Sequence, residues 1–266
     1  MGIDNDFAGS IRLASVLGVF LLGLIPFRKI KGVRRLTNHH NVIGYFFSVA
    51  GSIYGILLGL VVVSSISLFD AARINVNAES TTLVSIYMLA ENLPENDRKL
   101  IRAYCRDYTH SVINNEWATM TTGEHHPISR SYAANLFKEI VRVSENNGNA
   151  GQKMLDLGQS LVESRRERLD TSSRSIPVIE WIALCVGGVF VVLFSYFLVT
   201  DSLIVQMIGT GMITIMVCLN IYLVVAFASP FSGSLKVSDA PLRKALDTFD
   251  HIDIIYQKDQ SDPSAN

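Results

Sequence analysis

Small residues recur in one apolar stretch of the sequence at spacings of three and four residues, the repeat of an α-helix. The stretch spans residues 42–69 and carries no charged side chain; its small residues are Gly44, Ser48, Gly51, Ser52, Gly55 and Gly59. Small side chains let helix backbones approach closely in lipid, where packing drives helix association. The stripe therefore predicts a helix–helix contact, and alternatively the border of a pore with a polar wall of Ser48, Ser52, Ser64, Ser65 and Ser67. Both hold when several copies of the helix pack around one axis.

Three ionisable side chains mark the ends of the apolar runs and are candidates for a pore mouth. Asp70 and Arg73 directly follow residues 42–69, and Glu180 lies near the start of the run at 178–199. A glutamate at this depth anchors a helix at the membrane surface, whereas a ring of such residues in an oligomer attracts ions. Asp70 and Arg73 are spaced for a local salt bridge on one helix, and alternatively Arg73 balances Glu180.

Histidines, cysteines and carboxylates form no catalytic or metal-binding pattern in the sequence. The pairs His39–His40 and His125–His126 are adjacent, so neither presents two ligands on one helix face. The three cysteines contain no CxxC element, and two of them lie inside apolar runs. The carboxylates are interpreted as scattered charges on helix surfaces. We therefore expect no enzyme, no metal and no cofactor, and the net charge of −1 gives no indication of nucleic-acid binding.

The composition indicates a membrane protein. Of the 266 residues 49% are apolar and 18% are charged, compared with roughly 25% charged in soluble domains. The runs 42–69, 178–199 and 203–231 are each long enough for a helix across the bilayer, which takes about 20 residues. Only three residues separate the last two runs, so they are predicted to form an antiparallel hairpin.

A weaker apolar run covers residues 8–27. It contains Arg12 and Pro26, and a secretory signal peptide is the alternative to a membrane helix. The acidic residues Asp4 and Asp6 precede the run, and no clear cleavage site follows it. These observations favour a first transmembrane helix, which gives four in total.

Residues 70–177 predict a water-soluble helical bundle between the second and third transmembrane helices. Apolar residues repeat there at helical spacing, for example Leu83, Ile86, Tyr87 and Ala90. The predicted fold class is therefore an all-α membrane protein with this helical domain inserted. Residues 28–41 form a basic loop, and residues 232–266 form a C-terminal tail that we expect to be disordered beyond about residue 256.

The orientation in the membrane follows from the basic loop. Residues 28–41 hold five lysines and arginines and no acid, a pattern typical of cytoplasmic loops. With four spans, both termini and the middle domain then lie outside the cell. Basic residues near the third span and after the fourth favour the opposite orientation, but long loops cross the membrane largely regardless of charge. The predicted localisation is multi-pass in the cell membrane.

The sequence resembles the bacterial bestrophin-like membrane protein family over roughly residues 38–245. The residues that carry this resemblance are Tyr54 to Gly59, Phe69 to Arg73, Glu79, Leu93–Pro94, Glu116–Trp117, Arg165 to Arg168, Ile176–Pro177 before Trp181, Phe194 to Tyr196 and Ser229 to Gly233. The resemblance implies a likeness to pentameric anion channels in which the second helix lines the pore. Two acidic positions expected in the family are absent, because Ala228 and Ser229 precede Pro230 and Val42 follows the His-Asn pair. A cation site formed by those acids in relatives does not transfer.

Two functional hypotheses of different classes follow. The first is a homo-oligomeric, channel-like protein with the second helix nearest the pore, whose partners are the lipid bilayer, further copies of the chain and inorganic ions. In the second, the middle domain is a sensor or docking module, and the transmembrane helices serve as anchor and dimer interface. A membrane enzyme is the weakest interpretation, because only Glu180 and nearby arginines offer reactive groups.

Overall fold

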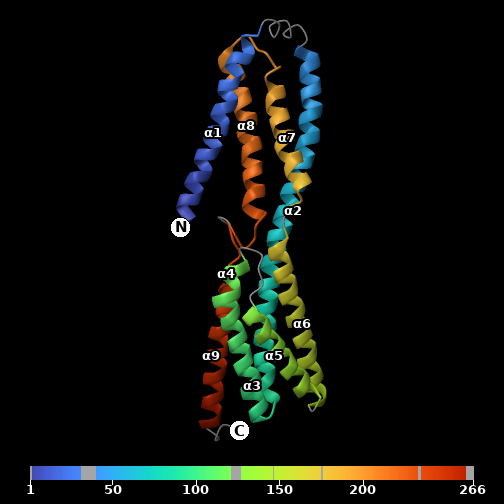
Figure 1. Cartoon of the computed structure of the whole chain (residues 1–266), viewed down its shortest axis with the longest axis vertical. Coiled ribbons are helices and arrows are strands. Elements are labelled where there is room, and N and C mark those ends of the chain that lie inside the picture. The colour runs from blue at the N-terminus through green and yellow to red at the C-terminus, as the bar shows by residue number, and fades with distance from the viewer. Residues whose placement is uncertain are drawn as a thin grey trace. The chain divides into compact units, whose positions relative to one another are not determined.

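The computed structural model describes residues 2–30, 40–120, 127–145, 147–174, 176–232 and 235–261. Within these ranges the chain is helical and contains no strand, which confirms the predicted all-α class (Figure 1). Most of the basic loop, residues 31–39, and the turn at 121–126 with His125 and His126 lie outside the described residues.

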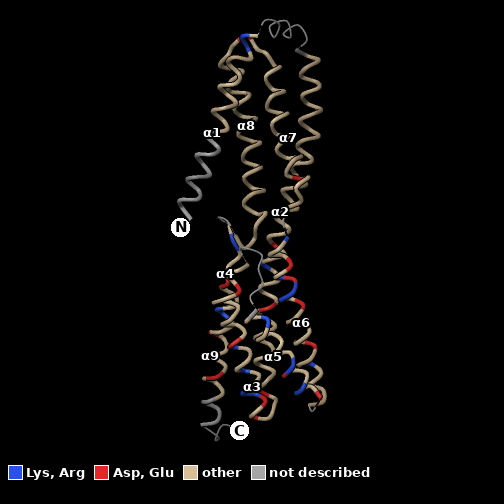
Figure 2. The backbone as a smooth tube through the Cα atoms, in the orientation of Figure 1, with Lys and Arg blue, Asp and Glu red and all other residues tan. Residues whose placement is uncertain are grey.

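The chain divides into two compact units. The first comprises Met1–Leu68, Ser175–Ser229 and Gly233–Leu235, and the second comprises Phe69–Arg174, Pro230–Ser232 and Lys236–Asn266. Lysine, arginine, aspartate and glutamate gather on the helices of the second unit and are rare on those of the first (Figure 2). This distribution separates an apolar unit from a polar one.

The first unit consists of apolar helices. They are α1 (Gly2–Arg28), the beginning of α2 (His40–Leu89), α7 (Val178–Ser195) and α8 (Leu203–Phe227). Among the described residues, α2, α7 and α8 are long and apolar enough to cross a membrane, and Ser15–Arg28 of α1 is a shorter apolar segment. Both α7 and α8 end about four residues earlier than the apolar runs predict.

The core of the first unit forms where α2 packs against α7 and α8. Tyr54 of α2 packs there with Leu184 of α7 and Val224 of α8, and the Tyr54 hydroxyl donates a hydrogen bond to the Leu184 carbonyl at 3.0 Å. The Tyr54 ring occupies the space beside Gly187, where a Cβ atom would lie 2.6 Å from the ring. A glycine is therefore required at 187 for this close approach.

Arg28, at the end of α1, joins this helix to the turn between α7 and α8. Its guanidinium donates to the Thr200 carbonyl at 2.6 Å, to the Asp201 carbonyl at 3.0 Å and to the Gln206 side chain at 3.2 Å. Gln206 in turn donates to the Tyr196 carbonyl at 3.0 Å. The end of α1 and the α7–α8 turn therefore lie side by side in the first unit.

The second unit is a helical bundle around one apolar core. It contains the end of α2, the short 3₁₀ turn η2 (Ala90–Asn92), α3 (Glu95–Ser111), the π-helical turn η3 (Val112–Glu116), α4 (Trp117–Thr119), α5 (Pro127–Ser144), α6 (Gly148–Ser173) and α9 (Ala240–Ser261). Apolar side chains of α2, α3, α5, α6 and α9 meet in this core.

The C-terminal segment corrects the prediction of a tail. Residues 240–261 form α9, whose Leu242 and Phe249 are fully buried in the core of the second unit. Phe249 stacks on Tyr87, with the ring centroids 4.1 Å apart. Arg106 of α3 pairs with Asp253 of α9 at 2.8 Å. The expected disorder beyond residue 256 is also wrong as far as Ser261, because the helix continues to that residue.

Candidate functional site

One face of α2 is buried from Tyr54 onward. Buried residues recur on this face at spacings of three, four or seven positions; they are Tyr54, Leu58, Val61, Ser65, Ala72, Val76, Glu79, Leu83 and Ile86. This repeat keeps one face toward the chain's own helices and leaves the remaining surface of α2 open.

The predicted small-residue stripe lies on the open part of α2. Ser48, Ser52, Gly55 and Gly59 are exposed, and Gly44 and Gly51 are half-buried. A Cβ atom added at Gly51, Gly55 or Gly59 would meet nothing within 4 Å, whereas one at Gly44 would reach the Leu198 side chain at 4.0 Å. Among the described residues, the surface beside Gly51, Gly55 and Gly59 is therefore open.

Ser65 corrects the predicted polar wall. Its side chain is 1% exposed, and its hydroxyl donates to the Val61 carbonyl at 2.8 Å. Ser65 thus lies on the buried face of α2, because it falls in the repeat of Val61 and Ala72. Ser64 and Ser67 are exposed.

Of the three candidate pore-mouth residues, Asp70 and Arg73 form an ion pair with each other, and Glu180 lies apart from them in sequence. Arg73 and Asp70 are 3.4 Å apart and about half exposed, as the local spacing on α2 predicts. Glu180 is partly exposed in the first turn of α7, where a carboxylate is favoured by the helix dipole. It forms no ion pair with any described residue.

A buried network of charges in the second unit was not predicted. Glu79 of α2, Glu116 of η3 and Arg168 of α6 are fully buried and lie in direct contact. The Arg168 guanidinium is 3.1 Å from Glu79 Oε1 and 2.7 Å from Glu116 Oε1. Arg165 donates to the second Glu116 oxygen at 2.6 Å. The interpretation of all carboxylates as surface charges is therefore wrong for Glu79 and Glu116.

Three other side chains surround the Arg168 network. The Tyr108 hydroxyl donates to Glu79, and the Trp117 ring centre lies 6.0 Å from the Arg168 guanidinium carbon. Arg168 also approaches the Met120 sulfur at 2.8 Å. Burial and the Glu79 carboxylate raise the pKa of Tyr108 well above its ordinary value, so the phenol remains a donor at neutral pH.

The π turn helps to build this network. A π turn has one more residue than the α-helical repeat, so it changes the direction of the side chains that follow it. Here it ends at Glu116, directly before Trp117, and both side chains lie beside Arg168 of α6. The sequence signal was the place of Glu79 in the apolar repeat between Val76 and Leu83, which puts a carboxylate on a buried face.

This network supplies structural rigidity more than reactivity. Its two carboxylates and two guanidiniums neutralise one another, and each carboxylate accepts from at least one arginine. Across the part of the chain that the structure describes, no three histidine, cysteine or acidic side chains are grouped so as to hold a metal ion.

Comparisons with known proteins agree with this helical architecture. A family model described as a bestrophin-like domain matches residues 14–242. The fold is similar to that of a bacterial bestrophin homologue from Klebsiella pneumoniae, with 15% sequence identity and a TM-score of 0.68, covering 89% of this chain and 98% of that chain. A variant of that homologue with one mutation gives 14% identity and a TM-score of 0.70, covering 90% and 97%. No curated protein matches the sequence.

Proposed function

Because the chain belongs to the bestrophin-like family of membrane proteins, we propose that it is a homo-oligomeric, channel-like protein that conducts ions, with α2 nearest the pore. The family is associated with channels rather than with enzymes. The observation that carries the proposal is the open small-residue surface of α2, centred on Gly55.

The packing of α2 supports an assembly of several copies. Each copy already buries the face with Tyr54 and Leu58 against its own helices. The surface with Ser52, Gly55 and Gly59 is open among the described residues of the same copy, and small residues favour close helix contact in lipid. When several copies pack around a symmetry axis, this surface contacts the neighbouring copies and also borders the pore. The partners are then further copies of the chain, lipid and inorganic ions.

The charged residues at the helix ends are proposed to form rings in such an assembly. Every copy contributes Asp70 and Arg73 where α2 leaves its apolar run, and Glu180 at the start of α7. Rings of carboxylates or guanidiniums attract ions of opposite charge. The exposed Asp70–Arg73 pair supports this role, because neither side chain is used in a buried contact.

Cysteine cross-linking tests the assembly. Ser52→Cys, in a background with Cys185→Ser and Cys218→Ser, is expected to form disulfide-linked dimers when oxidised in membranes, because each chain then has one accessible thiol and the same exposed residue of neighbouring copies meets near the axis. The matched control is Gly209→Cys on the exposed surface of α8, which is expected to remain monomeric. Purely monomeric Ser52→Cys contradicts the assembly.

We further propose four spans, with both termini and the second unit outside the cell. The contacts of Arg28 with Thr200 and Asp201 support α1 as a span, because antiparallel spans bring these ends to one side. A cysteine introduced at the exposed Lys138 tests the orientation, in a background without Cys185 and Cys218. We expect a membrane-impermeant maleimide added to intact cells to label Lys138→Cys. Labelling only after permeabilisation would place the second unit in the cytoplasm.

A further inference from the structure

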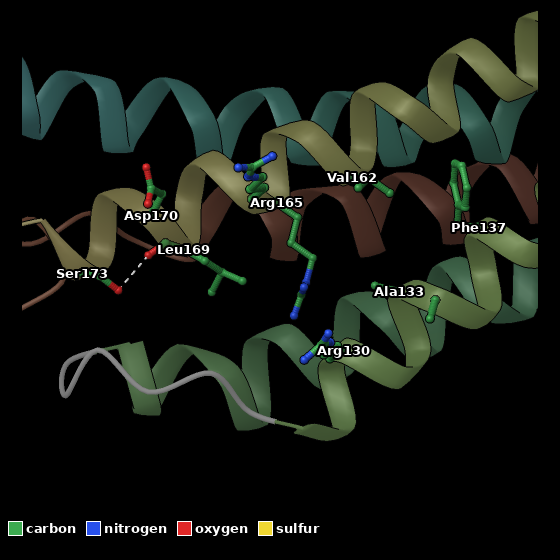
Figure 3. Close-up of a pocket in the computed structure, with 10 residues that line it drawn as sticks. Arg130, Ala133, Phe137, Val162, Arg165, Leu169, Asp170 and Ser173 are labelled. Carbon is green, nitrogen blue, oxygen red and sulfur yellow. Dashed lines mark hydrogen bonds between the residues drawn. The ribbon is translucent and has the colours of Figure 1, made fainter.

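A cavity lies between α5 and α6 of the second unit (Figure 3). Its volume of 420 Å³ falls within the range of small-molecule sites in proteins. Neither helix belongs to the apolar unit, and the proposed conduction role does not use this cavity.

The cavity has an apolar wall and a basic wall. Phe137 of α5 and Val162 and Leu169 of α6 supply the larger apolar side chains. The basic wall consists of Arg130 from α5 with Arg165 and Arg166 from α6. The single acid in the lining is Asp170, and Arg174 already pairs with it at 2.8 Å. The lining therefore carries an excess of positive charge next to apolar surface.

The guanidiniums of the cavity have unused hydrogen-bond donors. Arg130 and Arg166 make no hydrogen bond or ion pair with any described residue. One terminal N–H group of Arg165 donates a hydrogen bond to Glu116, whereas its Nε is buried and has no acceptor within the described structure. Figure 3 shows the Arg165 side chain extending from α6 toward Arg130 of α5. The exposed guanidiniums of Arg130 and Arg166 therefore remain available to an incoming acceptor.

We infer that this cavity binds a small amphiphilic anion, a carboxylate with an apolar or aromatic body. The carboxylate accepts hydrogen bonds from the exposed guanidinium of Arg130, and Arg165 and Arg166 add positive charge to the same wall, because planar guanidinium groups match carboxylate geometry. The body packs on Phe137, Val162 and Leu169, which removes apolar surface from water. Through Arg165 the bound anion also contacts the buried Glu116–Arg168 network.

Calorimetry on the full chain in lipid nanodiscs tests this site, with empty nanodiscs subtracted. The probes are phenylacetate, its uncharged analogue 2-phenylethanol, and inorganic phosphate, which has charge but no apolar body. We expect saturable binding of phenylacetate only. Arg130→Gln removes a guanidinium that binds the carboxylate, so it is expected to weaken phenylacetate binding at least tenfold. The variant is expected to keep the fold, because the Arg130 side chain is exposed. Lys138→Gln, the same loss of charge on α5 outside the cavity lining, is expected to bind as the natural chain does.

Four results would overturn the inference. Absence of saturable phenylacetate binding removes the site, and equal binding of 2-phenylethanol shows partition into lipid. Binding that Arg130→Gln leaves unchanged places the anion elsewhere. Phosphate that binds as tightly as phenylacetate contradicts the role of the apolar wall. None of these results depends on whether the protein conducts ions.

Discussion

Arg168→Met is expected to destabilise the second unit by about 3–5 kcal/mol, because it leaves two carboxylates in a buried site without their shared counter-charge. Glu79 loses its arginine partner completely, and Glu116 retains only Arg165. Methionine fills much of the volume of arginine, so the loss of charge dominates over any cavity. For a domain of this size, the change corresponds to a fall in Tm on the order of 10 °C.

The thiol of Cys105 reports this unfolding. It is fully buried in the core of the second unit, and burial raises the pKa of the thiol, so a maleimide reacts only when the core opens. In a background with Cys185→Ser and Cys218→Ser, we expect labelling of Arg168→Met to begin at a clearly lower temperature. The control is Arg174→Met, directly after the end of α6, whose exposed pair with Asp170 contributes at most about 0.5 kcal/mol. Equal midpoints for the two variants would mean that the buried network adds nothing to stability.

The apolar unit could be predicted from the sequence because its signals are local. Runs without charge predict helices of membrane length, and the repeat of small residues predicts which surface of α2 carries Gly55 and Gly59. The role of Arg28 could be predicted only in part from the sequence. Its charge was interpreted as an orientation signal, whereas its hydrogen bonds to Thr200 and Asp201 depend on where the α7–α8 turn lies.

The second unit was harder to predict because its decisive contacts are distant in sequence. Helix α9 has a polar composition, and its anchor is Phe249 stacked on Tyr87, far from it along the chain. From the sequence alone, Asp253 is interpreted as a solvated surface charge. In the structure its carboxylate pairs with Arg106 of α3. Arg168 likewise meets Glu79 across 89 positions of sequence. Side-chain type alone does not separate such buried pairs from surface charges.

Gly55→Trp is expected to abolish ion conduction without unfolding the chain. A Cβ atom at this position meets nothing within 4 Å in the same copy, so the indole causes no clash inside the protomer. Any effect on current must therefore come from the space that neighbouring copies and the pore share. Gly209→Trp is the matched control, because Gly209 is an exposed glycine on α8 with equally open surroundings.

The most direct measurement is the current across a planar bilayer that contains the purified protein, recorded under an ion gradient. We expect discrete currents for the natural chain and for Gly209→Trp, and background current for Gly55→Trp, with the reversal potential identifying the ion. Silence of the natural protein, when it is folded and inserted, would contradict the channel and favour a membrane-anchored sensor or docking module. Currents that Gly55→Trp leaves unchanged would contradict a pore along α2.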